Sequence, residues 1–479
     1  MSREKYDAVV VGAGPNGLSA AIRLQQAGLS VLLLEASHIP GGGARSAELT
    51  LPGFVHDICS AVHPLTVASP WLNSLALDRF GLEFVHAPVA AAHPLDDGDS
   101  VALYRDLETT ARSLQEDSDQ YQQLLRPFVE EWSALARDLL GPLRWPRHPA
   151  LFARFGLRAM RSATSLAKRF HRPQTRALWA GMAAHSILPL SYTATSSFGL
   201  VLLSLGHAVG WPFPRGGAQR IADALVQLFT ANGGSIVTDT EVRSLKDIPS
   251  ARAVLFDLTP RQLVSIAGDE LSDFYKWRIR RYRYGMGVFK IDWALDAPVP
   301  FISEDCQLAG TIHLGGSFEE IVKGEDDVSK GKHPSRPFVL FAQPSRFDPR
   351  RAPEGMHTAW AYCHVPHGST ADMTDAIEAQ VERFAPGFRK HVIARHTMNT
   401  FQMQAYNANY VGGDINGGAA DITQLFARPV MQLSPYRTSR KGFYLCSSST
   451  PPGGGVHGMC GMHAADAALR DIFRLRISK

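Results

Sequence analysis

Three glycines and one carboxylate near the start of the chain have the types and the spacing to hold a dinucleotide. Gly12, Gly14 and Gly17 stand between an apolar run and a helical pattern, and a second apolar run ends at Glu35. Glycine allows a tight turn and lets the backbone approach a pyrophosphate, while the helix N-terminus supplies free N–H groups. A carboxylate at Glu35 accepts hydrogen bonds from ribose and repels a 2′-phosphate. The pattern therefore predicts a βαβ unit that binds FAD or NAD rather than NADP.

A second glycine-rich loop lies almost a whole chain away, between a strand-like run at 443–446 and a helix-like run at 459–475. It contains Gly453, Gly455 and Gly458, but too few residues follow for another strand and its acid. We therefore expect this loop to serve the flavin end of one long cofactor, with backbone N–H groups facing the flavin carbonyl oxygens. One FAD held at both ends of the chain accounts for both loops.

Five further segments match one known family. They are 41–46 (GGGARS), 211–217 (WPFPRGG), 241–242 (EV), 289–295 (FKIDWAL) and 412–415 (GGDI). With the two glycine loops they make the chain resemble, nearly end to end, the phytoene desaturase-like group of FAD-dependent oxidoreductases. The last two segments most resemble the branch that contains the pyridine nucleotide-disulphide oxidoreductase domain proteins and their bacterial relatives.

The resemblance implies which residues bind FAD. Glu35 and the first loop would hold the ADP half, Arg45 would approach the pyrophosphate and flavin, and Val242 would offer its backbone to adenine. The full set is Gly12, Gly14, Pro15, Asn16, Gly17, Glu35, Ala36, Gly42, Gly43, Arg45, Val242, Gly454, Gly455, Val456 and His457. The segment 446–450 (CSSST) lacks the acid that many relatives carry before the last glycine loop. Hydroxyls or backbone groups are expected to replace it there.

Two histidines are the candidate catalytic residues. A flavin takes hydride at N5, so the protein needs to position a C–H bond, hold an acid or base and exclude water. In relatives the region around His63 passes close to the flavin, and His457 lies in the distal loop itself. A purely structural role, such as capping a loop, stays open for each. No cysteine pair or other pattern indicates a metal site.

Other polar residues have ordinary structural explanations. A polar turn suits Tyr406, Asn407 and Asn409, although they are also candidates to line the cavity. Lys290 resembles the lysine that positions water near N5 in flavin amine oxidases, but its place in a strand favours a lysine on a sheet face. His185 and His207 are expected to be satisfied histidines at the core or its boundary.

The expected fold class is α/β, with a discontinuous Rossmann-like FAD-binding domain and an α+β substrate domain. The chain has 479 residues, 45% of them hydrophobic, which is enough for two or three domains. We expect the FAD-binding domain at 1–80, 206–275 and 426–479, and the substrate domain at 81–205 and 276–425.

Four strand-like runs predict an antiparallel sheet in the substrate domain. They lie at 287–293, 311–314, 338–341 and 358–365, and Pro and Gly bound them. A helical cover is expected over about 110–205. In relatives such a sheet lies over the flavin and forms one wall of the substrate cavity.

Two stretches of the cover bear on substrate access. Residues 144–176 contain nine Lys or Arg and no Asp or Glu, interleaved with apolar side chains. This pattern fits peripheral contact with an anionic membrane, or a cover whose apolar face packs on its own domain. Residues 177–214 carry no charge at all, and Pro and polar residues interrupt them, so we expect buried helices rather than a membrane span.

The cellular setting is expected to be cytoplasmic, with membrane association as the alternative. The first apolar run begins so early that no signal or transit segment is expected. The five cysteines are scattered and odd in number, which suggests reduced thiols. The net charge of +4 accompanies no nucleic-acid module.

The sequence predicts an FAD-dependent oxidoreductase that dehydrogenates or saturates a CH–CH bond of a hydrophobic substrate by hydride transfer at flavin N5. Three alternatives stay open: a flavin amine oxidase, a redox-neutral double-bond isomerase and a non-catalytic flavin-binding scaffold. Neither the substrate, the electron acceptor, the mode of FAD attachment nor the oligomeric state follows from the sequence.

Overall fold

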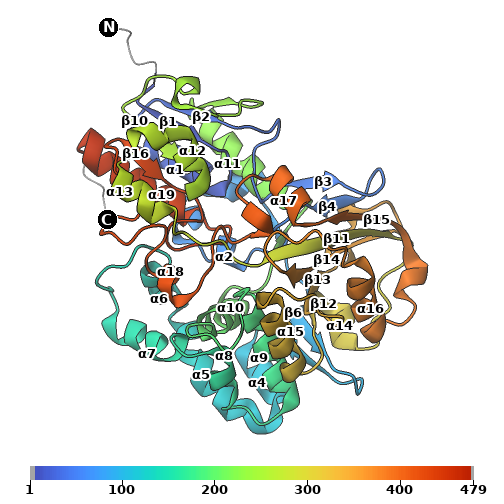
Figure 1. The fold of residues 1–479 in the computed structure, drawn as a ribbon. Helices are drawn as coiled ribbons and strands as arrows, with labels where there is room; N and C mark the ends of the chain where they lie inside the picture. The colour runs from blue at the N-terminus through green and yellow to red at the C-terminus, as the bar shows by residue number, and fades with distance from the viewer. Residues whose placement is uncertain (1–5, 476–479) are drawn as a thin grey trace.

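A parallel sheet, a mixed sheet and a group of helices make up the fold. The structure is a computed structural model and describes residues 6–475. Figure 1 shows the parallel sheet and its helices at the upper left, the mixed sheet at the right and the remaining helices below. Residues 8–11 and residues 443–445 form strands of the same parallel sheet, as one cofactor held by both glycine loops requires.

The parallel sheet has the order β16, β10, β1, β2, β9, and all its neighbouring strands are parallel. Its strands are β1 (Ala8–Val11), β2 (Val31–Leu34), β9 (Ser235–Val237), β10 (Ala253–Phe256) and β16 (Phe443–Leu445). The strands β1, β2 and β10 are buried along their whole length. Their unbroken apolar runs arise because helices cover both faces of a parallel sheet.

Helix α1 (Pro15–Gln25) packs between α11 (Gln219–Ala231) and α19 (Met459–Ala468). Proline suits the first position of α1, where no intrahelical N–H is needed. Small residues bring α1 and α19 together, since a Cβ at Gly461 would lie 1.8 Å from the carbonyl oxygen of Asn16. Helices α12 (Pro260–Ala267) and α13 (Asp273–Ile279) cover the other face of the sheet.

The second sheet has seven strands in the order β15, β11, β14, β13, β12, β6, β7. Its strands are β6 (Val89–Pro94), β7 (Ser100–Leu103), β11 (Gly287–Leu295), β12 (Ala309–Leu314), β13 (Val339–Ala342), β14 (His357–Val365) and β15 (Val392–Met398). One face packs through Phe289, Ile291 and Trp293 against α14 (Glu304–Leu308) and α16 (Thr374–Phe384). The opposite face therefore turns toward the parallel-sheet domain.

The helical cover consists of α4 (Leu107–Ser113), α5 (Ser118–Glu130), α6 (Trp132–Leu139), α7 (Pro149–Ala159), α8 (Ala163–Ala167), α9 (Pro173–Ala184), α10 (Ser196–Ala208) and α15 (Phe318–Ser329). Helices α9 and α10 are largely buried, which confirms the interpretation of the uncharged stretch 177–214. Over residues 6–475, no helix has both the length and the apolar character needed to cross a membrane.

Short elements connect these layers. They are β3 (Ser46–Glu48), β4 (Val55–Asp57), β5 (Phe84–Val85), β8 (Phe213–Pro214), α2 (Pro64–Val67), α3 (Pro70–Asn73), α17 (Thr400–Tyr406) and α18 (Ile422–Leu425). The hairpin of β3 and β4 and the helix α2 lead from the parallel sheet toward the mixed sheet.

The predicted fold class is confirmed, with one correction to the second sheet. That sheet is mixed rather than antiparallel, because β12 pairs with β6 in parallel. The four predicted strands correspond to β11, β12, β13 and β14, whereas β6, β7 and β15 were not predicted. The strands of the two sheets fall in the sequence ranges expected for the two domains; the domain boundaries themselves stay a prediction.

Candidate functional site

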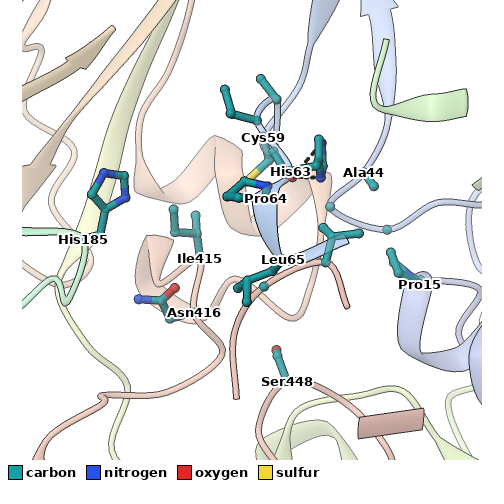
Figure 2. A pocket seen from close by; sticks show the side chains of 18 of the residues that line it. Pro15, Ala44, Cys59, His63, Pro64, Leu65, His185, Ile415, Asn416 and Ser448 are labelled. Carbon is teal, nitrogen blue, oxygen red and sulfur yellow. Dashed lines mark hydrogen bonds between the residues drawn. The ribbon is translucent and has the colours of Figure 1, made fainter. Parts of the chain in front are cut away.

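A cavity of about 280 Å³ lies where the two glycine loops meet the mixed sheet. Figure 2 shows His185 at one side of it and Pro15 at the other, with Cys59 and His63 between them. The predicted cofactor-binding residues that line it are Gly14, Pro15, Asn16, Gly42, Gly43, Gly455 and Val456. Those that lie outside its lining are Gly12, Gly17, Glu35, Ala36, Arg45, Val242, Gly454 and His457.

The first glycine loop leaves a strip of bare backbone along one wall of the cavity. A Cβ at Gly14 would lie 2.6 Å from Oδ2 of Asp257, and a Cβ at Gly42 would lie 3.0 Å from the Cα of Gly14. Gly42 also has a φ of +53°, which favours glycine. The two backbones are therefore in direct contact, and the cavity that both line at the start of α1 is where a pyrophosphate would meet the helix N–H groups.

Two buried carboxylates flank this loop. Glu35 accepts hydrogen bonds from the backbone N–H of Ala13 at 2.6 Å and of Ser37 at 2.9 Å. Asp257, directly after β10, accepts from the N–H of Gly17 at 2.9 Å. Burial raises the pKa of Asp257 to about 7, and the nearby charge of Glu35 adds to this. Asp257 was not among the predicted site residues, although an acid at the end of an apolar strand run was a signal for it.

Arg45 supports the glycine turn at 41–43 rather than the cavity wall. Its Nε donates to the carbonyl oxygen of Gly42 at 2.9 Å, and its Nη1 donates to Oγ of Ser37 at 2.6 Å. The guanidinium lies 4.3 Å from the ring centre of Tyr406. Tyr406 is thus a structural partner of the loop, whereas Asn409 lines the cavity and donates to the backbone oxygen of Asp257.

The distal loop meets the first one across the cavity. Hydroxyl groups hold its backbone: Thr66 donates to the carbonyl oxygen of Val456 at 2.6 Å, and Ser69 donates to that of His457 at 2.7 Å. Ser448, from the segment 446–450, also lines the cavity. The loop leads directly into α19.

The two candidate catalytic histidines have different surroundings. His63 lines the cavity, and its ring lies within 3.5 Å of the hydroxyls of Ser60 and Thr66. Burial lowers the pKa of His63 to about 4. His457 is buried outside the cavity lining, where its Nδ1 accepts a hydrogen bond from the N–H of Met459 at the start of α19. The structure therefore brings only His63 into the cavity.

Side chains from the mixed sheet and the cover form the other half of the cavity. They are His185, Leu202, Trp211, Thr311, Leu340, Trp360 and Tyr362. His185 is half-buried at the boundary of the core, where it lines the cavity and its Nε2 lies 3.1 Å from that of His313. His207 is a satisfied core histidine as expected, since Tyr121 and the carbonyl oxygen of Arg105 contact its two ring nitrogens.

Lys290 lies beside this wall, on the same face of the sheet as Tyr362, with which it pairs. Its side chain is buried, forms an ion pair with Asp292, and has its ammonium 5.8 Å from the ring centre of Trp360. It does not line the cavity, which agrees with a lysine on a sheet face. Among residues 6–475, no group of three His, Cys, Asp or Glu side chains is placed to hold a metal ion.

These residues fit FAD. Gly14 and Gly42 line the cavity without side chains that would cover it, and Oδ1 of Asn16 at the start of α1 is buried without a hydrogen-bond partner. The cavity then continues from the helix N-terminus to an aromatic wall, which suits a flavin and a substrate. Fold and site together define a flavoprotein of the dinucleotide-binding class.

Residues 7–268 match the family of FAD dependent oxidoreductases, and the chain belongs to this family. It is 27% identical to pyridine nucleotide-disulfide oxidoreductase domain-containing protein 2 of Rattus norvegicus, over 98% of this chain and 94% of that protein. It is 25% identical to the lycopene-forming phytoene desaturase of a Paracoccus species, over 96% of both chains. An oxidoreductase of Methanosarcina mazei shares the fold with a TM-score of 0.66 and 17% identity, covering 97% of this chain and 99% of that one. The predicted family, FAD cofactor and oxidoreductase class are confirmed.

Proposed function

We propose that the protein removes hydrogen from, or adds it to, a CH–CH bond of a hydrophobic substrate. The cavity carries this proposal, because Leu202, Leu340, Trp360 and Tyr362 line the half that lies away from the glycine loops. The similarity to a phytoene desaturase along almost the whole chain supports it. FAD, when bound, supplies the group that exchanges hydride with the substrate.

We assign the accompanying proton to His63. Its low pKa means that the ring is neutral near pH 7, so one ring nitrogen carries no proton and can accept one. The side chain is only 2% exposed, which keeps bulk water away from that nitrogen. His457 is assigned a positioning role, because its ring holds the first N–H of α19 next to the distal loop.

We propose that FAD lies along the residues inferred from the family resemblance. The pyrophosphate would contact Gly14 and Gly42, and the flavin would contact Gly455 and Val456, which line the cavity. The adenine would lie near Val242, whose backbone groups have no hydrogen-bond partner in the part of the chain described. Glu35, Ala36 and Gly12 belong to the same end of the parallel sheet.

The cavity disfavours an amine oxidase that sandwiches its substrate between two aromatic rings. Trp360 and Tyr362 are nearly parallel, with 15° between their planes, but their centroids are only 5.7 Å apart. A molecule between two rings needs about 3.5 Å to each of them, or roughly 7 Å in total. These rings therefore form one continuous wall for an apolar substrate.

The test is an anaerobic titration of the FAD-loaded protein with polyenes, alkenes, saturated acyl compounds and amines. Bleaching of the flavin band by an alkene or acyl compound supports the proposal. His63→Ala should slow that bleaching by about 100-fold without loss of FAD, whereas His86→Ala, a change at an exposed histidine outside the cavity, should not. Bleaching by amines alone would contradict it, as would turnover that occurs only after dithionite reduction without net electron uptake.

We also propose a cytoplasmic protein that attaches reversibly to anionic membranes through residues 144–176. The five cysteines are free, as in a reducing compartment. Part of this stretch packs on its own domain, because four of its apolar side chains are buried: Leu151, Phe155, Leu166 and Phe170. Trp145 and Leu157, however, are 86% and 78% exposed among the arginines. An apolar side chain beside basic groups is the combination that binds an anionic bilayer surface.

Co-sedimentation with vesicles tests this attachment. Vesicles that contain anionic lipid should retain the protein at low salt, and neutral vesicles should not. The double variant Trp145→Ser with Leu157→Ser should lose most of this binding. The matched control is Phe401→Ser, which removes a 72% exposed aromatic from α17. Equal loss in both variants, or no binding by the unchanged protein, would contradict the proposal.

A further inference from the structure

Two adjacent histidines at the aromatic end of the cavity have no part in the reaction assigned above. His185 ends α9 and lines the cavity, and His313 on β12 is buried behind it. Their Nε2 atoms lie 3.1 Å apart. Burial lowers the pKa of His185 to about 3 and that of His313 well below its ordinary value, so both rings are neutral. One Nε2 must therefore carry a hydrogen and donate a hydrogen bond to the other.

Gly181 indicates which nitrogen of His313 carries the proton. Nδ1 of His313 is buried without a hydrogen-bond partner, and a Cβ at Gly181 would lie only 2.6 Å from it. A Cα hydrogen of Gly181 consequently points at this nitrogen. A hydrogen on Nδ1 of His313 would clash with that Cα hydrogen, whereas an unprotonated Nδ1 accepts a weak C–H hydrogen bond from it. His313 then donates from Nε2 to His185, whose own proton lies on Nδ1.

This arrangement leaves two donors at one end of the cavity. The Nδ1–H of His185 has no acceptor in the described part of the chain. Thr311 lies two residues before His313 and on the same face of β12. Its hydroxyl accepts from Nε1 of Trp211 at 3.0 Å, and no described residue accepts the hydroxyl proton. A ligand oxygen would satisfy both donors, which are costly to leave unpaired in an apolar cavity.

We propose that His185 and Thr311 bind a carbonyl oxygen of the substrate, which is thus a hydrophobic ketone, aldehyde or acyl compound rather than a plain hydrocarbon. The inference deepens the proposed function and rests on it. Trp211, Trp360 and Tyr362 supply the apolar surface around this oxygen, and His313 acts as a positioning residue that fixes the proton of His185. A site that offers donors discriminates against an analogue that lacks the oxygen, because the donors then stay unpaired.

The test measures binding of matched compounds to the FAD-loaded protein through the change in flavin absorbance. Two pairs are used: a linear C10 2-ketone with the C10 alkane, and a monoterpene ketone with its hydrocarbon. His185→Phe should weaken ketone binding by about three- to tenfold and change hydrocarbon binding by less than about twofold. His185→Asn should restore much of the ketone binding, because its side-chain N–H can stand in for Nδ1–H. The control His207→Phe changes a buried histidine outside the cavity and should leave both unchanged.

Equal effects of His185→Phe on ketone and hydrocarbon would overturn the inference, as would a failure of the unchanged protein to bind any ketone. Flavin bleaching, recorded in the same samples, separates this inference from the proposed function. Bleaching by hydrocarbons without preferential ketone binding leaves the dehydrogenase standing and removes the carbonyl site. If ketone binding depends on His185 but no compound bleaches the flavin, the carbonyl site stands and the proposed dehydrogenation is removed.

Discussion

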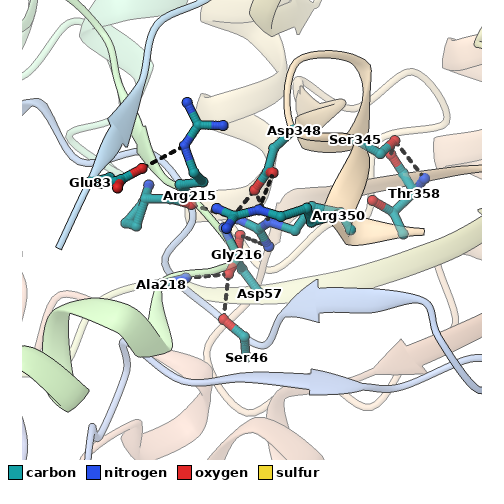
Figure 3. Close-up of polar contacts among 12 residues, drawn as sticks. Ser46, Asp57, Glu83, Arg215, Gly216, Ala218, Ser345, Asp348, Arg350 and Thr358 are labelled. Carbon is teal, nitrogen blue, oxygen red and sulfur yellow. Dashed lines mark hydrogen bonds and ion pairs between the residues drawn. The ribbon is translucent and has the colours of Figure 1, made fainter. Parts of the chain in front are cut away.

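Arg351→Met should be one of the most destabilising single changes in the chain. Figure 3 shows the buried polar cluster to which Arg351 belongs, including Asp57 and Asp348. The side chains of all three are 0% exposed. Arg351 Nη1 lies 3.1 Å from Oδ2 of Asp57, its Nε lies 3.4 Å from Oδ2 of Asp348, and its Nη2 donates to the carbonyl oxygen of Pro214. The cluster therefore ties the mixed-sheet domain to the β3–β4 hairpin and the segment 214–218.

The magnitude follows from what methionine would leave behind. It has a similar length but no charge, so Asp57 would stay buried without its cation and Asp348 would keep only its contact with the exposed Arg350. Removing one partner of a buried ion pair costs about 3–5 kcal/mol, which is a large share of a typical folding free energy. Adding Asp57→Asn to the variant should recover part of the loss, because the amide oxygen can still accept from Ser46 and from the N–H of Ala218.

The assay is urea unfolding of Arg351→Met, followed by circular dichroism, with the m-value compared between variants. Arg350→Met is the matched control, since Arg350 contacts the same Asp348 at 3.3 Å but is 59% exposed. An exposed ion pair contributes at most about 1 kcal/mol, so the control should unfold almost like the unchanged protein. The reasoning is refuted if the two variants lose the same stability at equal m-values.

Two further predictions concern the nucleotide site. Gly14→Ala should abolish FAD binding, measured as the ratio of flavin to protein absorbance, because its Cβ would meet Asp257; Gly156→Ala, in open space on α7, is the control and should keep FAD. For Asp257→Asn, the pKa of about 7 against an ordinary 3.8 means that the folded protein keeps a proton that the unfolded chain releases. Asp257 therefore stabilises the fold fully below about pH 4, and this contribution is lost as the pH rises to 7. The free-energy difference between the unchanged apoprotein and Asp257→Asn should fall over that range by at most about 4 kcal/mol in urea unfolding, and a constant difference would contradict the assignment.

The first half of the site could be predicted because its signals are local. In the βαβ unit, an apolar run, three glycines, a helical pattern and Glu35 follow one another within about thirty residues, and each step has one physical explanation. Short contacts such as that between Gly14 and Gly42 then follow from the same loop geometry. The same reasoning could have predicted Asp257, because it follows an apolar strand and the carboxyl ends of parallel strands meet at one edge of the sheet.

Two strands of the mixed sheet, β6 and β15, have sequences that only weakly indicate a strand. The strand β6 reads VAAAHP and contains small residues with low strand propensity, although it is fully buried. The edge strand β15 reads VIARHTM, with basic side chains that typically mark loops as well as sheet edges. Both strands are stabilised by pairing with distant segments, β6 with β12 and β15 with β11. Such pairing has no local sequence signature.

The proposed carbonyl site depends on the register of the strands in the mixed sheet, so it could not be predicted from the sequence. Tyr362 pairs with Lys290 and with Leu340 on the neighbouring strands, which turns Trp360 and Tyr362 toward the cavity. A shift of one residue would instead present Ala361 and Cys363, because the side-chain period of a strand is two. In the same way, His185 is separated from His313 by more than a hundred residues, and the pair exists only because α9 packs across the sheet at β12. Seen alone, each is an ordinary histidine; together they leave one N–H of His185 without an acceptor among residues 6–475.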